Sequence, residues 1–147
     1  MMKKLLYLLF LPLLLLTSCD MESSDNGELD AMWYLVKVDS VKSGATRDYR
    51  DKRIMWSFQG DLLQMNKTER FNAYYMAYFK NEDGYLKLST PFLFDRVKGD
   101  EILTEDRLEE VRRFGINSLE ENFRIETLNS SQMILKDDVL RLTFERY

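Results

Sequence analysis

The sequence predicts a mainly β protein, a small antiparallel barrel with one short α-helix near the C-terminal third. Three observations lead to this prediction. Short apolar segments with strand-like alternation recur at near-regular spacing from residue 31 onward. A single amphipathic segment interrupts them late in the chain. Closure into a barrel also removes exposed strand edges, and a β-sandwich is the alternative.

Residues 1–18 have the plan of a secretory signal peptide. Lys3 and Lys4 precede an apolar run of 12 residues, 5–16. This length suits the apolar region of a signal peptide, roughly 7–15 residues, and falls short of the ~20 that a helix needs to cross a bilayer. A short buried helix is the alternative interpretation of this segment.

The signal segment ends at the single cysteine of the chain. Leu-Thr-Ser-Cys at residues 16–19 resembles the lipobox of bacterial lipoproteins. The resemblance implies that Cys19 receives a diacylglycerol group, that the chain is cut before it, and that its new amine is acylated, with palmitate for example. Two or more acyl chains hold a protein on a membrane where one binds only marginally. We therefore expect a lipid on Cys19 that anchors the protein in the membrane as its partner. This places the protein in the cell envelope at the outer membrane, on its periplasmic face or at the cell surface. An unmodified cysteine is the alternative.

Residues 19–30 form an acidic and polar segment. Such a composition buries too little surface to offset the conformational entropy of the chain, so we expect a flexible acidic tether. Acids placed just after the lipidated cysteine resemble the surface-export signals of lipoproteins in the Bacteroides group. A simple solvated tether is at least as good an interpretation.

Residues 31–147 are expected to form one domain of strands. Gly84 suits the turn of the clearest hairpin, and Pro91 should end its second strand or lie at an edge or bulge. Residues 136–138 suit a tight turn. The predicted strands are MWYLVKV (32–38), RIMWSFQ (53–59), LLQMNK (62–67), RFNAYYMAYFK (70–80), YLKLST (85–90), NFRIETL (122–128), SQMILK (131–136) and VLRLTFERY (139–147).

The predicted helix covers residues 104–115. Thr104 can cap its start, and an apolar stripe of about three turns recurs at every third residue, at Leu108, Val111 and Phe114. Ser118 and Glu121 have the spacing of a capping box, which would open one further helical turn.

AMWYLVKV at residues 31–38 resembles the Gly-X-Trp strand of lipocalins and related calycin barrels, with Ala31 in place of the glycine. Residues 112–123 and 123–147 resemble the short lipocalin-like lipoproteins of the Bacteroides group. The resemblance implies a lipocalin-like barrel. In calycin barrels a basic residue of the last strand lies across the first-strand tryptophan, which implies a cation–π contact of Arg146 with Trp33. The alternative is that Arg146 extends into solvent.

Aromatic residues on the predicted strands can line a pocket inside the barrel. Rings and alanines alternate between residues 71 and 79, which leaves room beside the rings if this face points inward. The candidate residues for binding a small apolar ligand are Trp56, Phe58, Tyr75 and Phe92. In the alternative, these rings fill a solid core and the barrel surface meets another envelope protein.

Composition argues against several other functions. The absence of histidine removes His-based catalytic triads and imidazole metal ligands. Without Lys3 and Lys4, the 21 basic residues become 19 against 25 acidic ones, a net charge of −6 that argues against a nucleic-acid partner. Adjacent acids such as Glu120 and Glu121 diverge on a strand or helix, so a hydrolase would need two acids that converge in a cleft. We therefore expect a non-enzymatic protein with no cofactor and no metal.

Overall fold

The computed structural model describes residues 25–68 and 74–147. Residues 1–18 and Cys19, for which we predict the signal peptide and the lipid, lie outside this part. The α-helix of this part is α2 (Glu109–Arg112), and three 3-10 turns are η2 (Gly27–Leu29), η3 (Arg50–Lys52) and η4 (Glu105–Arg107). The strands are β1 (Met32–Ser40), β2 (Thr46–Asp48), β3 (Ile54–Gln59), β4 (Leu62–Lys67), β5 (Tyr74–Glu82), β6 (Tyr85–Phe94), β7 (Glu101–Ile102), β8 (Glu120–Leu128), β9 (Gln132–Lys136) and β10 (Leu140–Arg146).

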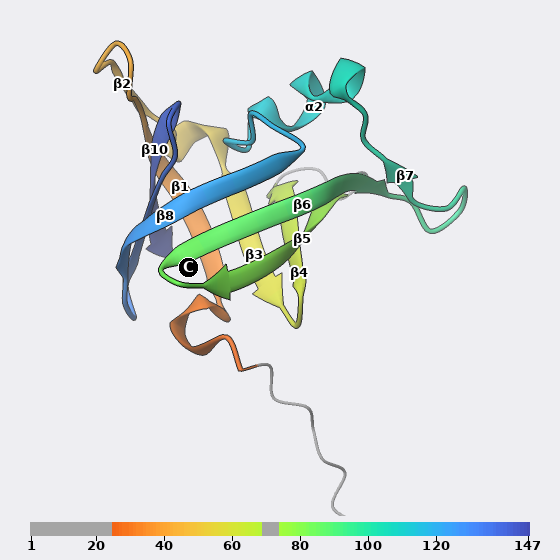
Figure 1. The fold of residues 1–147 in the computed structure, drawn as a ribbon, viewed down its shortest axis with the longest axis horizontal. Coiled ribbons are helices and arrows are strands. Elements are labelled where there is room, and N and C mark those ends of the chain that lie inside the picture. The colour runs from red at the N-terminus through yellow and green to blue at the C-terminus, as the bar shows by residue number, and fades with distance from the viewer. Residues whose placement is uncertain (1–24, 69–73) are drawn as a thin grey trace, which may run out of the picture.

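Eight of the strands close into an antiparallel barrel (Figure 1). Their order is β1-β3-β4-β5-β6-β8-β9-β10, and β10 pairs with β1 to complete the circle. The two short strands lie beside this circle: β2 pairs with the second half of β1, and β7 pairs with β6. The predicted fold class, a small antiparallel barrel with one short helix, is therefore confirmed.

Strand β10 illustrates how alternation in the sequence separates the two faces of the barrel. Leu142 and Phe144 point inward and are fully buried. Arg141 and Glu145 alternate with them on the outer face, where Arg141 Nε donates to Glu126 Oε2 at 2.6 Å. Side chains of a strand alternate between its faces, so this pattern lets one strand serve both core and surface.

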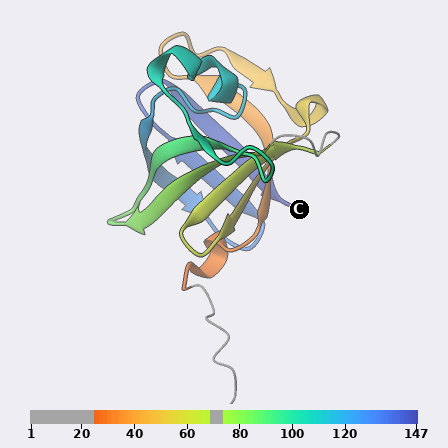
Figure 2. The ribbon, with the colours of Figure 1, turned by 90° about the vertical axis from the view of Figure 1, so that its right-hand side faces the viewer.

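Helical turns cover both ends of the barrel (Figure 2). At the η2 end, Leu29 is fully buried and its carbonyl accepts the indole N–H of Trp33 at 3.1 Å. At the opposite, α2 end, the carbonyl of Phe114 accepts the indole N–H of Trp56 at 3.1 Å. Each tryptophan of the chain thus ties one covering segment to the barrel, and η2 lies within residues 19–30, the predicted tether.

The helical segment is shorter than predicted. Residues 105–107 form the 3-10 turn η4, the α-helix α2 has only four residues, and the Thr104 hydroxyl donates to the Asp106 carboxylate rather than capping a backbone N–H. The apolar stripe of Leu108, Val111 and Phe114 is nevertheless buried against the barrel. Apolar residues at every third position match the 3.0 residues per turn of a 3-10 helix as well as they match an α-helix. The sequence pattern therefore does not distinguish the two kinds of helix, which explains why the predicted α-helix is partly a 3-10 turn.

The segment after α2 also differs from the prediction. Glu121 Oε1 accepts the backbone N–H of Ser118 at 2.8 Å, as the glutamate of a capping box does. The chain then enters strand β8, so this hydrogen bond closes a turn before a strand and opens no helix. No helix in the described part of the chain is long and apolar enough to span a membrane.

Candidate binding grooves

The interior of the barrel is packed with aromatic side chains. The most deeply buried rings, each at most 1% exposed, are those of Trp33, Trp56, Phe114, Phe123 and Phe144. The ring centroid of Trp56 lies 4.9 Å from that of Phe144 and 6.1 Å from that of Phe123. Rings at these distances are in contact, so they occupy the space that an interior ligand would need.

Three of the four predicted ligand-binding residues belong to this packed core. Trp56, Phe58 and Tyr75 are all buried within it. Phe58 meets Phe79 edge to face at 5.0 Å between centroids, and the Tyr75 hydroxyl donates to Glu110 Oε2 at 2.7 Å. These contacts match the alternative interpretation, in which the rings fill a solid core.

Phe92, the fourth predicted residue, lies on the outer face of the barrel. Residues 90–91 of β6 stand opposite the single residue Ala77 of β5, which makes a β-bulge at the proline, one of the positions predicted for it. The extra residue reverses which side chains point inward, so Leu93 packs against the core instead of Phe92. The ring of Phe92 contacts the exposed ring of Tyr78, at 5.9 Å between centroids. Because the bulge shifts the alternation by one residue, the strand pattern before Pro91 does not indicate the direction of Phe92.

Arg146 lies over the first-strand tryptophan at the η2 end. Its guanidinium carbon is 6.0 Å from the centroid of the Trp33 ring, at the outer limit of a cation–π contact. One of its nitrogens, Nη1, also donates to Glu28 Oε2 at 2.9 Å. Arg146 therefore links the last strand, the first strand and the η2 turn at this end of the barrel.

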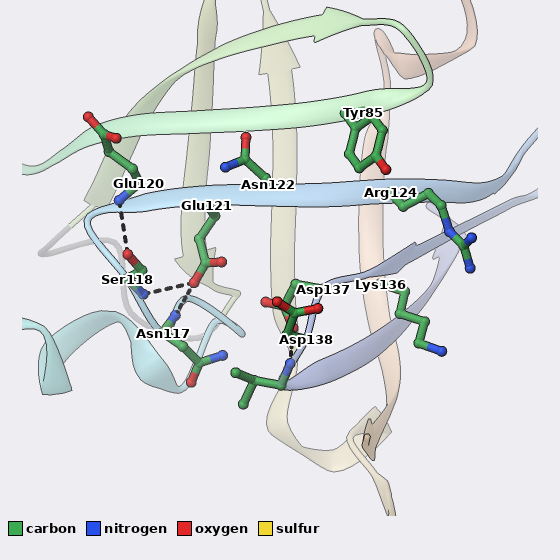
Figure 3. A pocket seen from close by; sticks show the side chains of 11 residues that line it. Tyr85, Asn117, Ser118, Glu120, Glu121, Asn122, Arg124, Lys136, Asp137 and Asp138 are labelled. Carbon is green, nitrogen blue, oxygen red and sulfur yellow. Dashed lines mark hydrogen bonds between the residues drawn. The ribbon is translucent and has the colours of Figure 1, made fainter. Parts of the chain in front are cut away.

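A polar groove of about 590 Å³ lies near the α2 end, where β8 and β9 meet the loop before β8 (Figure 3). We call it the acid groove because two converging carboxyl groups, Glu121 and Asp137, form part of its wall. Basic and aromatic side chains from the outer faces of the strands complete it. They include Tyr85, Arg124 and Lys136.

Glu121 is the most buried carboxyl of the acid groove, at 6% exposure. Its Oε1 atom accepts the backbone N–H groups of Asn117 and Ser118, toward which its side chain points in Figure 3. Burial raises the pKa of Glu121 to about 7, and the neighbouring Asp137 carboxylate adds to the rise. Glu121 therefore keeps its proton to higher pH than an exposed glutamate does.

The carboxylate of Asp137 can accept a hydrogen bond from protonated Glu121. Its Oδ1 atom accepts the backbone N–H groups of Val139 and Leu140, at 2.7 and 2.6 Å. Its Oδ2 atom is buried and has no hydrogen-bond partner among the described residues. A proton on Glu121 gives this oxygen the donor that it lacks, which joins the two side chains into one carboxyl pair.

Sequence reasoning identified both acids but not their pairing. Glu121 was predicted to cap a helix and Asp137 to form a turn, and 16 positions separate them in the chain. The alternation of side chains along the strands indicates that both acids point inward. Glu121 lies on the same face as the buried Phe123, and Asp137 on the same face as the buried Leu135. Each carboxyl group uses one oxygen to hold backbone N–H groups, so both have a structural task at the end of the barrel.

A second groove of about 490 Å³ lies at the α2 end itself, between the β1–β2 connection, α2 and the start of β10. We call it the mouth groove. Arg47, Arg112 and Arg113 line it together with one acid, Glu109. Its remaining walls are uncharged and include Val38, Ser43, Tyr49 and Leu140.

Comparison with known proteins agrees with the barrel. A family model described as a lipocalin-like domain matches residues 14–147. A lipocalin-like protein from Bacteroides uniformis has a similar structure, with a TM-score of 0.60 at 14% identity over 82% of this chain and 100% of that one. An uncharacterized protein from Bacteroides eggerthii is similar with a TM-score of 0.57 at 18% identity, over 80% of this chain and 98% of that one.

A protein from Burkholderia xenovorans is also similar, with a TM-score of 0.51 at 18% identity over 80% of this chain and 82% of that one. At these identities the likeness concerns the fold. No curated protein matches the chain by sequence.

Proposed function

This chain belongs to the lipocalin-like domain family, and we propose that it is a lipid-anchored binding protein of the cell envelope that recognises its partner on the outside of a solid barrel. This proposal rests on the aromatic packing around Trp56, because these side chains fill the interior of the barrel. Both grooves described above lie outside this core, at or near the α2 end. We therefore propose binding in these grooves in place of the predicted binding of an apolar ligand inside the barrel by Trp56, Phe58 and Tyr75.

The proposed anchor limits the distance between the η2 end and the bilayer. Cys19 precedes Gly27, the first residue of η2, by eight positions, and a fully extended chain of that length spans at most ~29 Å. A lipid on Cys19 therefore keeps the η2 end close to the outer membrane. The α2 end and its mouth groove then face away from the bilayer, where a soluble small molecule or another envelope protein can reach them.

We propose recognition without catalysis. The chain has no histidine, and the two acids that converge, Glu121 and Asp137, each hold backbone N–H groups. Glu121 is also almost fully buried, which leaves little of it for a substrate. These features favour a binding protein over a carboxylate hydrolase.

Metabolic labelling tests the anchor. In cells fed an alkyne fatty acid, the wild-type protein is expected to carry the label and to sediment with membranes. The Cys19→Ser variant is expected to lose the label and to remain uncleaved. Unlabelled mature wild-type protein would overturn the anchor.

Binding of a neutral apolar dye tests the solid barrel. The mature chain from residue 19, with Cys19→Ser to prevent lipidation, is expected to show no saturable fluorescence change with N-phenyl-1-naphthylamine. Saturable binding of this uncharged dye would instead support an apolar ligand within the barrel.

A further inference from the structure

We propose that the mouth groove binds an organic anion, a molecule that joins a carboxylate, phosphate or sulfonate to an apolar portion. The proposal rests on the function proposed above only in placing recognition outside the barrel. The groove volume of about 490 Å³ falls within the range of small-molecule sites, roughly 300–1,000 Å³. Its walls come from separate parts of the chain that only the closed barrel brings together.

The charge of the mouth groove is opposite to that of the whole protein. The chain has a net charge of −4, yet three arginines and a single acid line this groove. That acid, Glu109, is already paired with Arg112 at 2.9 Å. Arg47 makes no ion pair with another described residue, so its charge remains available to a ligand.

Arg113 is held in place by aromatic rings. Its guanidinium carbon lies 5.0 Å from the ring centroid of Phe114 and 5.8 Å from that of Tyr75. A guanidinium that lies over rings still has its N–H donors in its own plane, and these suit the planar carboxylate and the tetrahedral phosphate or sulfonate. A cation that is positioned before binding loses less conformational entropy when the anion arrives.

The rest of the groove suits the body of such a ligand. Val38 and Leu140 contribute aliphatic surface beside the arginines. Ser43 Oγ accepts the backbone N–H of Ala45 at 3.2 Å, which leaves its own proton free to donate. Tyr49 adds a half-buried ring to the same wall. A charged group near the arginines and an apolar group over these side chains can therefore be accommodated together.

Two dyes that differ in one charged group test the proposal. Both are added to the mature chain with Cys19→Ser. 8-Anilinonaphthalene-1-sulfonate carries a sulfonate on the ring system of N-phenyl-1-naphthylamine, which is neutral. We expect saturable binding of the sulfonate, weakened by salt, with an affinity at least about tenfold above that of the neutral dye.

Arginine variants locate the site. Arg47→Gln and Arg113→Gln are each expected to weaken sulfonate binding about three- to tenfold, since each removes one charged partner. Arg47→Lys should retain most of the affinity because the charge remains. Arg96→Gln is the matched control, because Arg96 lies over Phe94 in the β6–β7 connection and is not part of the groove. Thermal unfolding of each variant confirms that it is folded.

Competitors separate two sources of the anion. Displacement of the dye by octanoate would indicate a soluble carboxylate, whereas displacement only by vesicles that contain phosphatidylglycerol would indicate a lipid headgroup. Either result supports the anion site.

Two outcomes overturn it. If neither dye binds, the anion site is absent while the solid barrel stands. If both dyes bind with equal affinity and the arginine variants change nothing, the anion site and recognition outside the barrel both fail.

Discussion

Glu121 joins three segments of the chain through one side chain. From β8 it holds the backbone of Asn117 and Ser118, and it adjoins the Asp137 carboxylate in the turn after β9. Burial without protonation would leave two carboxylates facing each other at low dielectric, which is costly. Between pH 4.5 and about 7, the folded state therefore retains a proton on Glu121 that the unfolded chain releases.

This proton makes stability depend on pH. The pKa of Glu121 rises from 4.5 to about 7 on folding, so the native state binds more protons than the unfolded state between these values. The free energy of unfolding is therefore expected to fall as the pH rises from about 4.5 to about 7, by up to about 3 kcal/mol. Carboxyls with a lowered pKa, such as Asp39, lose their contribution at lower pH and do not mask this window.

Urea unfolding at pH 5 and pH 8 measures the effect. Glu121→Gln should flatten the dependence, because the amide accepts the same backbone N–H groups and donates to Asp137 at every pH. Glu120→Gln, at the exposed neighbouring position, should leave the dependence unchanged. A wild-type protein equally stable at both values would refute the raised pKa of Glu121.

Gly115 makes a second residue-level prediction. Its φ is +93°, and a Cβ atom there would lie 2.7 Å from Leu142 Cδ1 in the core. Gly115→Ala is expected to lower the free energy of unfolding by about 2–4 kcal/mol, through backbone strain and a steric clash. Gly99→Ala is the control, with a φ of +91° and open space around the added methyl group. Equal losses in the two variants would show that the clash contributes nothing.

At the scale of elements, the barrel depends on the segments that cover its ends. The four residues of α2 are too few to be stable as an isolated helix, so their order comes from packing. Val111 and Phe114 bury the apolar side of this segment, and η2 does the same through Leu29. The bulge at residues 90–91 shows a second influence at this scale, since it decides which rings of β6 face the core.

The two tryptophans allow the covering segments to be loosened separately. Trp56→Phe removes the donor to the Phe114 carbonyl, which leaves a buried acceptor unpaired at a cost of about 1–3 kcal/mol. Hydrogen exchange is expected to accelerate in residues 105–117 and to change little in η2. Trp33→Phe should produce the opposite pattern, since its partner is the Leu29 carbonyl. Identical exchange patterns in both variants would argue against independent ends.

At the scale of the molecule, the barrel separates the end nearest the proposed anchor from the grooves. η2 and α2 lie at opposite ends in both ribbon views (Figures 1 and 2). The η2 end is expected to lie near the bilayer, with the mouth groove turned away from it.

Quenching by membrane lipids measures this orientation. A fluorophore on Ser130→Cys, beside Arg146 at the η2 end, should be quenched by nitroxide lipids more strongly than one on Asp138→Cys near the α2 end. The lipidated protein in vesicles is used, where Cys19 is blocked by its lipid. Equal quenching at both positions would contradict the proposed orientation.

Strand alternation and the late apolar stripe predicted a β fold with one helical segment, because they are local patterns that each record a buried face, and the pairing of β10 with β1 decided for the barrel over the sandwich. Strand alternation grouped Trp56 with Phe58 and Tyr75 with Ala77 on faces that the structure turns inward, but periodicity cannot distinguish a ring that lines a cavity from one that fills it. That difference depends on rings such as Phe144, which approach from distant strands. Only the tertiary structure decided the direction of Phe92, the pairing of Glu121 with Asp137 and the gathering of three arginines at the mouth. Each of these depends on where a bulge or a closed barrel places residues far apart in the chain, and no local pattern records such distances.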